Sequence, residues 1–232
     1  MPDWISYFDS DHPLYVSARH RQVHAALIAQ GMSRFVTPGA VVLDYGCGEA
    51  LHAEELAKET GGLILCDAAP HVRERLARRV AQHRRIEVLS PEQVAALPEA
   101  SLDLIVMHSV AQYLTESELD ATLALFRRLI NPGGLFVIGD IVPPDTSAVT
   151  DAVALLRLAA ANGFFAAAVG GLVRTVLSGY WQLRQSAGLS RYSEQAMLDK
   201  LTRAGFSGKR AAENIGHNQA RMTFVTMPAQ AR

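Results

Sequence analysis

The sequence predicts an α/β fold with a doubly wound, mostly parallel sheet covered by helices on both faces. From residue 40 onward, short apolar segments of strand length alternate with longer amphipathic segments of helix length. The apolar segments are nearly continuous, as expected for parallel strands that are buried on both faces. With 232 residues and 49% hydrophobic composition, the chain can bury one large core. We therefore expect a single domain.

The elements follow from the same alternation and from the residues that end helices. Five strands are expected at AVVLDY, GLILCD, RIEVL, LDLIVM and GLFVIGD, between residues 40 and 140. Helices are expected at residues 49–60, 70–82 and 116–130, the last ended by Asn131-Pro132-Gly133-Gly134. A leading helix is expected at residues 14–35, a late helix at 193–204, and late strands near 209–213 and 222–227. The single domain, 1–232, then divides into an N-terminal helical cover (1–36), a cofactor-binding core (37–141), a helical insertion (144–190) and a C-terminal helix with strands (191–232).

Composition and charge exclude several classes of protein. Lys and Arg together number 22 against 23 for Asp and Glu, so no bulk positive field attracts nucleic acid. The first residues do not have the pattern of a secretion signal, and we expect a cytoplasmic protein. The two cysteines, Cys47 and Cys66, lack the spacing of a zinc site, and both are expected to be reduced.

The loop after the first expected strand is the strongest local signal for a ligand. Gly46-Cys47-Gly48 follows Asp44 and Tyr45 and precedes a helix, whose free N–H groups favour an anion. A dinucleotide fingerprint would have a third small residue where Leu51 stands. Asp44 would repel a pyrophosphate but suits a ligand that carries an ammonium and a sulfonium. S-adenosylmethionine carries both cations, and its carboxylate suits the helix N-terminus.

A second acid lies at the end of the second expected strand. Asp67 follows Gly48 by 19 residues, close to the ~20-residue offset at which an acid meets ribose hydroxyls in this architecture. Asp67 could also cap the helix that begins at Pro70. Cys66, Ala68 and Ala69 are small enough for an adenine to lie beside them.

Together these segments resemble the class I, Rossmann-like S-adenosylmethionine-dependent methyltransferases. LDYGCGEA, LCDAAP, LPEASLDLIVMHSVAQYL and LINPGGLFVIGD occur in that family's order and spacing within residues 40–141. The resemblance implies a seven-stranded sheet whose last strand is antiparallel, with the cofactor over the ends of the first four strands. It also implies that Asp44, Gly46 and Gly48 surround the methionine portion, that Asp67 binds the ribose, and that His108 or Ser109 lines the cofactor.

The segment after the third strand departs from the family pattern. Members often have an acid or amide there that binds the adenine amino group, but this chain has Ser90-Pro91-Glu92-Gln93-Val94. We expect Ser90 or Gln93 to substitute, with Val94 beside the ring.

Three groups of residues are candidates for acceptor binding and for a general base, which helps if the acceptor is a hydroxyl or phenol. They are Tyr15 with His20 and His24 on one helix face, His108 with Gln112 and Tyr113 after the fourth strand, and Asp140 after the fifth. A solvated helix face also explains His20 and His24. No acid or amide follows Asp140 to complete a metal site, so we expect no metal. The polar segment 214–219 is interpreted either as a turn or as part of the acceptor pocket.

The insertion is unusually apolar and is expected to form short helices over the acceptor pocket, with Phe164 and Phe165 facing a small, largely apolar acceptor. The uncharged run from Leu158 to Val173 is shorter than the ~20 residues that a membrane span needs, so no transmembrane segment is expected. Contact with a membrane surface and homodimerisation remain alternatives.

Two other functions fit the same architecture. A nicotinamide-dependent oxidoreductase is disfavoured by Asp44 and by Leu51. A cofactor-binding protein without transfer activity is the second alternative, because fold alone does not prove function. The sequence therefore predicts a methyltransferase, with the identity of the acceptor open.

Overall fold

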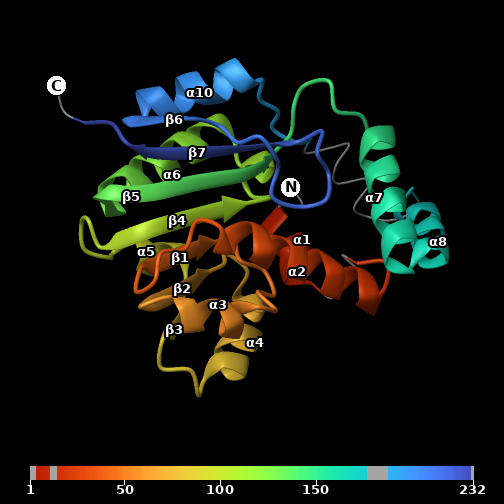
Figure 1. Ribbon diagram of the computed structural model, residues 1–232, viewed down its shortest axis with the longest axis horizontal. Coiled ribbons are helices and arrows are strands. Elements are labelled where there is room, and N and C mark those ends of the chain that lie inside the picture. Colours follow the sequence, from red (N-terminus) through yellow and green to blue (C-terminus); the bar gives the residue numbers. More distant parts are fainter. Residues whose placement is uncertain (1–3, 11–14, 177–187, 231–232) are drawn as a thin grey trace.

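The computed structural model describes residues 4–10, 15–176 and 188–230, and these contain a seven-stranded sheet (Figure 1). The strands are β1 (Val41–Tyr45), β2 (Gly62–Cys66), β3 (Ile86–Leu89), β4 (Leu102–His108), β5 (Ile130–Ile141), β6 (Phe206–Arg210) and β7 (Met222–Pro228). Their order across the sheet is β3-β2-β1-β4-β5-β7-β6. The first five strands pair in parallel, whereas β7 is antiparallel to both β5 and β6. The predicted fold class is confirmed, including the antiparallel last strand.

Helices cover both faces of this sheet. They are α1 (Trp4–Asp9), α2 (Ala18–Ser33), α3 (Ala53–Glu59), α4 (Pro70–Val80), α5 (Pro91–Ala95), α6 (Glu116–Leu129), α7 (Ala148–Asn162), α8 (Phe165–Val176) and α10 (Glu194–Arg203), with a 3₁₀ turn η1 (Ala111–Tyr113). On one face, Phe126 of α6 and Met197 of α10 are fully buried in one core cluster. On the other face, Leu56 of α3 and Leu76 of α4 belong to a second cluster. The sheet is thus buried on both sides, which explains its nearly continuous apolar strands.

Side-chain caps explain where several helices begin. Thr115 accepts a hydrogen bond from the N–H of Glu118, and the Glu118 carboxylate accepts one from the N–H of Thr115. Ser17 accepts from the N–H of His20, so α2 begins at Ala18 and not at residue 14 as expected. Residues 49–52 form turns, with Ala50 at a φ of 39°, and α3 therefore begins later than expected.

Other boundaries also differ from the expectation. The segment Asn131 to Gly134 does not separate a helix from a strand, because β5 already pairs at Ile130 and absorbs these residues in a register shift against β4. The strand expected at 209–213 is β6, which begins at Phe206, where a fully buried ring joins the core. The short helices α1 and α5 were not expected, since neither is long enough to show a helical period.

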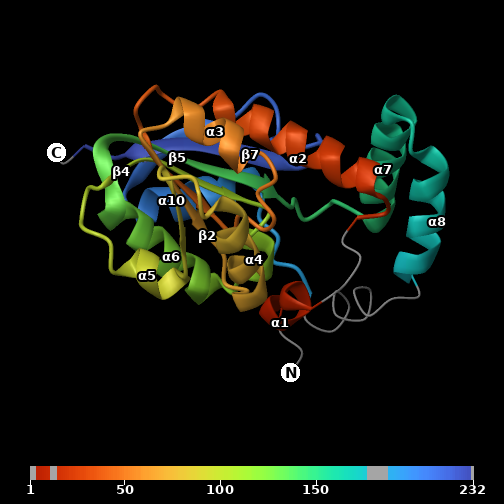
Figure 2. The same cartoon turned by 90° about the horizontal axis from the view of Figure 1, so that it is seen from below.

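Helices α7 and α8 lie beside each other at one end of the sheet, apart from the helices on its faces (Figures 1 and 2). Phe164, at the turn between them, is buried with Ala159 and Ala168 in a small separate cluster. Its ring stacks on that of His20 in α2, at a centroid distance of 5.2 Å. Residues 177–187 of the expected insertion lie outside the described residues, as does Leu14 of the expected leading helix. In the described ranges, no helix combines the length and the hydropathy that crossing a bilayer requires.

Candidate active site

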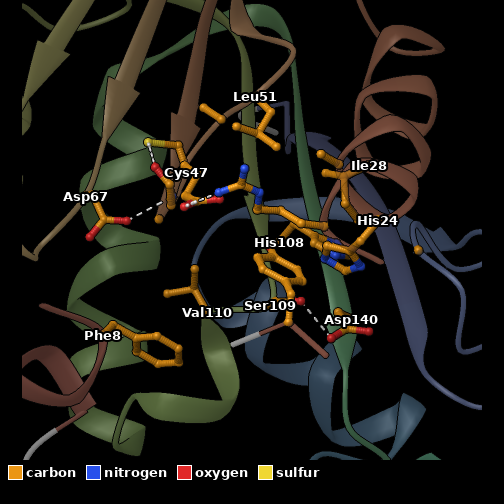
Figure 3. Close-up of a pocket in the computed structure, with 18 of the residues that line it drawn as sticks. Phe8, His24, Ile28, Cys47, Leu51, Asp67, His108, Ser109, Val110 and Asp140 are labelled. Carbon is orange, nitrogen blue, oxygen red and sulfur yellow. Dashed lines mark hydrogen bonds and ion pairs between the residues drawn. The ribbon is translucent and has the colours of Figure 1, made fainter. Parts of the chain in front are cut away.

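A cavity of about 1600 Å³ opens at the carboxyl ends of the parallel strands (Figure 3). Its walls come from α1 and α2, from the loops after β1, β2, β4 and β5, from α7, and from the segment before β7. Asp67 and Asp140 lie on opposite sides of the pocket in Figure 3, with Val110 between them. The cavity therefore has two halves, one at the ends of β1 and β2 and one at the ends of β4 and β5.

The loop after β1 needs its glycines for different reasons. Gly46 has a φ of 78°, and a side chain there would overlap Val110. Gly48 has a φ of 55° but faces open space, with no heavy atom of the described chain within 4 Å of where a Cβ would stand. The backbone of this loop can therefore approach a ligand closely.

Asp67 at the end of β2 organises this loop as well as facing the cavity. One carboxylate oxygen accepts a hydrogen bond from the N–H of Gly48 at 2.9 Å, and the other accepts from the N–H of Ala69 at 2.9 Å. Burial raises the pKa of Asp67, although these two backbone hydrogen bonds act in the opposite direction. Each oxygen keeps a second lone pair, so both can still accept hydrogen bonds from a ligand.

Asp44 at the end of β1 is an unusual acid. Burial and the nearby carboxylate of Asp67 raise the pKa of Asp44 to about 7. A positively charged ligand beside Asp44 would stabilise the ionised form of this carboxylate. The β1 and β2 half of the cavity thus fits a cation beside Asp44 and hydroxyl groups beside Asp67.

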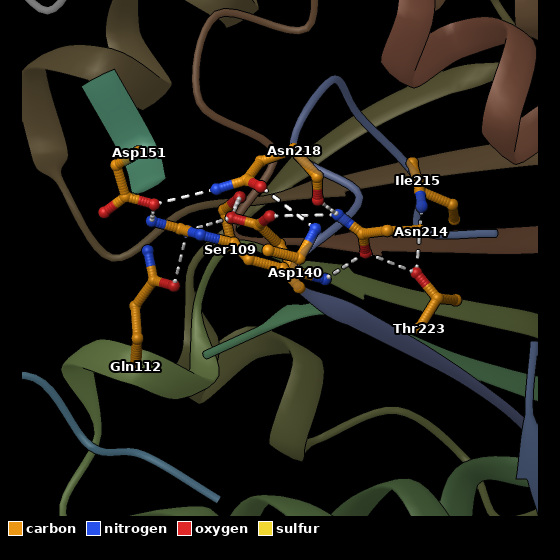
Figure 4. A network of polar contacts seen from close by, with 10 residues as sticks. Ser109, Gln112, Asp140, Asp151, Asn214, Ile215, Asn218 and Thr223 are labelled. Carbon is orange, nitrogen blue, oxygen red and sulfur yellow. Dashed lines mark hydrogen bonds and ion pairs between the residues drawn. The ribbon is translucent and has the colours of Figure 1, made fainter. Parts of the chain in front are cut away.

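The other half of the cavity contains a polar network that the sequence did not predict (Figure 4). Arg221, just before β7, donates to Asp140 at 2.6 Å and to Asp151 of α7 at 3.1 Å. Ser109 donates to Asp140 at 2.7 Å, and both residues have a positive φ, 58° and 65°. Asn214 exchanges hydrogen bonds with Asp140 through its side-chain oxygen and nitrogen. The network fixes the end of β5 and the first turns of α7 to the same arginine.

The charges of this network are balanced inside the protein. Burial acts to raise the pKa of Asp140, but Arg221 and His108 lower it below its usual value. Burial acts to lower the pKa of Arg221, but Asp140 and Asp151 raise it above its usual value. Both side chains of the Arg221 to Asp140 pair are only 13% exposed. Arg221 and Asp140 are therefore a charged pair at neutral pH.

Five histidines line the cavity, and burial lowers the pKa of four of them, which keeps these four neutral at pH 7. Burial lowers the pKa of His24 to about 3 and that of His20 to about 4. Burial also lowers the pKa of His108 and of His217, although the Asp140 carboxylate opposes this shift at both. The buried Nδ1 atoms of His24 and His108 have no hydrogen-bond partner within the described chain. Uncharged imidazole rings therefore form part of the cavity wall.

Tyr15 lies with two of these histidines on the α2 side of the cavity. Its ring is 5.3 Å from that of His20 and 5.7 Å from that of His24, centroid to centroid. Burial, together with Glu49, raises the pKa of Tyr15 to about 12, so its phenol stays protonated. The wall at this point is aromatic and uncharged.

Helix α1 adds a wall that the sequence analysis missed. Trp4 and Phe8 line the cavity, and their rings lie 4.6 Å and 5.1 Å from that of Tyr113. Asp9 fixes the helix to α4, because its carboxylate accepts from the N–H of His71 at 2.7 Å and contacts the His71 ring nitrogen at 2.7 Å. Three aromatic residues within the first eight were the available signal, but six helical residues are too few for a periodic pattern.

Most of the side chains predicted for the site line the cavity. These are Tyr15, His20, His24, Asp44, Tyr45, Gly46, Cys47, Gly48, Asp67, Ala68, His108, Ser109, Gln112, Tyr113 and Asp140. The polar segment before β7 also contributes, through Gly216, His217 and Asn218. Of the two interpretations of that segment, the structure favours a part of the pocket.

Five predicted residues are not among the described residues that line the cavity. Ser90 and Gln93 form the reciprocal cap of α5, and Val94 is fully buried in the core, which corrects the expected adenine contacts. Pro91 lines the cavity in their place. Phe164 is buried between α7, α8 and His20, and Phe165 is 50% exposed, which corrects the expectation that they face the acceptor.

Comparison with known proteins agrees with this geometry. Residues 42–134 match the family described as methyltransferase domain. No curated protein matches the chain in a sequence search. Among solved structures of the same fold, the partner of the Haloferax volcanii Trm112 methyltransferase activator has a TM-score of 0.65 at 16% identity, over 99% of this chain and 100% of that one.

Two further structures were solved with the cofactor or its product. The magnesium protoporphyrin IX methyltransferase ChlM from Synechocystis PCC 6803, with bound S-adenosylmethionine, has a TM-score of 0.60 at 13% identity, over 97% of this chain and 89% of that one. The N-methyltransferase NodS from Bradyrhizobium japonicum WM9, with S-adenosylhomocysteine, has a TM-score of 0.59 at 16% identity, over 98% and 97%.

The fold and the matched domain define the class of protein. Residues 42–134 form a methyltransferase domain within the class I methyltransferase fold. This match indicates a methyltransferase domain that uses S-adenosylmethionine. The described part of the chain holds no group of three His, Cys, Asp or Glu side chains arranged to bind a metal.

Proposed function

We propose that this methyltransferase acts in the cytoplasm on a small, largely apolar acceptor, which it binds in the half of the cavity between β4, β5 and α7. The observation that carries the proposal is the division of the cavity. The half with Asp44 and Asp67 suits the cofactor, and the half with neutral histidines and apolar α7 side chains remains for the acceptor. Unpaired Cys47 and Cys66 agree with a reducing compartment.

The residues present fit the cofactor. We place its charged methionine portion at Asp44 and the loop of Gly46 and Gly48, and its ribose at Asp67. The adenine then lies near Ala68 and Pro91, under Phe8 of α1. The Ser90 hydroxyl and the Gln93 side-chain oxygen are used in the cap of α5, and neither residue is among the described residues that line the cavity.

When bound, the cofactor supplies an electrophilic methyl carbon, whose bond to sulfur breaks as the bond to the acceptor forms. The protein must align the acceptor and exclude water. Trp4 and Phe8 on one side and α7 on the other supply apolar walls for this. Asp44 holds a negative charge on the cofactor side of the cavity.

Among the histidines, His108 has the best geometry for accepting a proton. A Cβ at Gly139 would lie 2.7 Å from its Nδ1, so that nitrogen faces the backbone of β5. The opposite edge, with Nε2, lies against Gly216, which lines the cavity. Burial lowers the pKa of all three histidines, so the ranking rests on the position of Nε2 of His108. We therefore assign the base role to His108 ahead of His20 and His24.

Replacing His108 with Ala should lower kcat by about 10²- to 10⁴-fold, the range for general-base catalysis, while the cofactor affinity changes little. The measurement is a rate of S-adenosylhomocysteine formation with the natural acceptor, beside a cofactor titration. His24→Ala is the matched control and should lower kcat far less. An unchanged kcat in His108→Ala would remove this residue from the chemistry.

The affinity for S-adenosylmethionine should fall as the pH falls below about 7. The pKa of Asp44 is about 7 in the free protein, and a cation beside the carboxylate lowers it, so binding at neutral pH releases a proton. Above pH 7 the carboxylate is already ionised and the affinity should level off. Calorimetric titration between pH 5.5 and 8.5 measures this, and Asp44→Asn should bind weakly with a flat profile. A flat wild-type profile would contradict the assignment.

The acceptor is the part of the proposal that needs a direct test. Radiolabelled S-adenosylmethionine, incubated with the protein and a fractionated cell extract, should label a small molecule that partitions into organic solvent. Label in a nucleic acid or a protein would contradict the proposal. Binding without any turnover would favour the non-catalytic alternative, and binding of NADH would favour the oxidoreductase.

A further inference from the structure

The cavity is larger than the cofactor and a compact acceptor require. Small-molecule sites usually enclose ~300–1000 Å³, whereas this cavity has a volume of about 1600 Å³. Side chains of α7 and Leu172 of α8 form part of its lining. The cavity therefore has room for an acceptor larger than a compact metabolite.

Apart from Asp151, which is paired with Arg221, the α7 side chains that line the cavity are apolar. Ala152, Leu155 and Leu156 line the cavity, and so do Val149 and Val153. The last two are also 70% and 39% exposed to solvent. An apolar surface thus continues from the interior of the cavity to the surface of the protein.

Another part of the cavity wall, at the ends of β4 and β5 and in the segment before β7, is polar but presents no unpaired charge to a ligand. His108 and His217 are neutral there, and Asp140 is paired with Arg221. A ligand that fits both parts of the wall has a neutral group that forms hydrogen bonds beside His108 and His217. It also has an apolar chain that lies along α7. A compact polar metabolite would leave the α7 wall in contact with water, and a purely apolar ligand would leave the imidazole nitrogens without partners.

We infer that the methyl acceptor is an amphipathic molecule whose polar head lies at His108 and His217 and whose apolar chain leaves the cavity past Val149 and Val153. This inference rests on the proposed function and specifies the class of its acceptor. The occupant of the α7 face is the acceptor chain itself, because these two valines belong to the same continuous cavity as the histidines. Val169 and Val173 of α8 are also exposed, at 44% and 61%, but they do not line the described cavity.

These two valine pairs allow a matched experiment. The probes are 4-alkylphenols from 4-methylphenol to 4-octylphenol, titrated into protein saturated with S-adenosylhomocysteine. In the wild type, affinity should rise about fourfold for each methylene that becomes buried. The double variant Val149→Ser with Val153→Ser should bind 4-methylphenol like the wild type but bind 4-octylphenol at least about tenfold more weakly. The control, Val169→Ser with Val173→Ser, has the same substitutions at the same helical spacing and should follow the wild type along the whole series.

Each other outcome overturns the inference. Affinity that does not depend on chain length, or no binding of any probe, excludes an apolar chain in this cavity. An equal loss in both double variants assigns the effect to a general apolar surface on α7 and α8, such as a lipid or protein contact. Failure of the proposed function is seen separately, because S-adenosylhomocysteine would then not saturate the protein. Circular dichroism of both double variants shows whether each one is folded.

Discussion

Replacing Asp67 with Ala is expected to weaken binding of S-adenosylmethionine by about two to four orders of magnitude. A hydrogen bond to a charged group contributes roughly 1.5 to 3 kcal/mol, and the ribose offers two hydroxyls to this carboxylate. The same substitution removes the acceptor for the N–H groups of Gly48 and Ala69, so the loop that faces the cofactor loses its anchor. Isothermal titration calorimetry measures the loss directly.

Two controls separate the ligand contact from the loop. Asp67→Asn keeps one side-chain oxygen and should bind the cofactor with intermediate affinity. Asp103→Asn alters another acid that accepts a backbone hydrogen bond, from Val41 at 2.8 Å, but at the opposite ends of the strands. It should leave cofactor affinity unchanged. If Asp67→Ala binds the cofactor as tightly as the wild type, our placement of the ribose is wrong.

Replacing Arg221 with Met should lower the free energy of unfolding by about 3 to 5 kcal/mol at pH 7. The substitution leaves the carboxylates of Asp140 and Asp151 without their cation, with side-chain exposures of only 13% and 19%. Lowering the pH should reduce the defect, because the unpaired carboxyls take up protons and the buried charge disappears. Urea unfolding at pH 7 and pH 5 measures both effects.

A triple variant tests why stability is lost when Arg221 is replaced. The cause is either the lost attraction between the charges or the burial of carboxylates that no longer have a cation beside them. Arg221→Met together with Asp140→Asn and Asp151→Asn removes all three charges and should recover part of the lost stability. Arg210→Met is a suitable control, because this arginine pairs with Glu194 at the surface, with side chains 40% and 48% exposed, and should cost less than ~1 kcal/mol. A loss in Arg221→Met no larger than in this control would show that the network does not stabilise the fold.

The cofactor half of the site could be predicted from the sequence because local patterns specify it. Each of its features can be recognised from a few neighbouring residues. These features are the buried strands, the glycines of the loop after β1, and the acids at two strand ends. Asp44 lies in β1 opposite Leu65, and Asp67 directly follows β2, so the pairing of these two parallel strands places both acids at the same edge of the sheet. The antiparallel last strand came from the family resemblance, not from any local pattern.

The ion pairs of the acceptor half could not be predicted, because they join distant segments. Arg221 pairs with Asp140 across 81 residues and with Asp151 across 70. Nothing near Arg221 in the sequence indicates either partner. Ser90 and Gln93, which were expected to contact the adenine, are not among the described residues that line the cavity, because the Ser-x-x-Gln spacing forms the cap of α5. Phe164 is not among the described residues that line the cavity, because its ring is buried between α7 and α8 and stacks on His20 of α2.

The position of β7 has a consequence for how the enzyme is made. β7 is the last strand of the described chain, yet it is inserted between β5 and β6, and Arg221 directly precedes it. During synthesis, the residues of the cofactor half leave the ribosome before Arg221, which anchors Asp140 and α7. A nascent chain that does not yet include Arg221 should therefore hold the donor-binding segments without a completed reaction chamber.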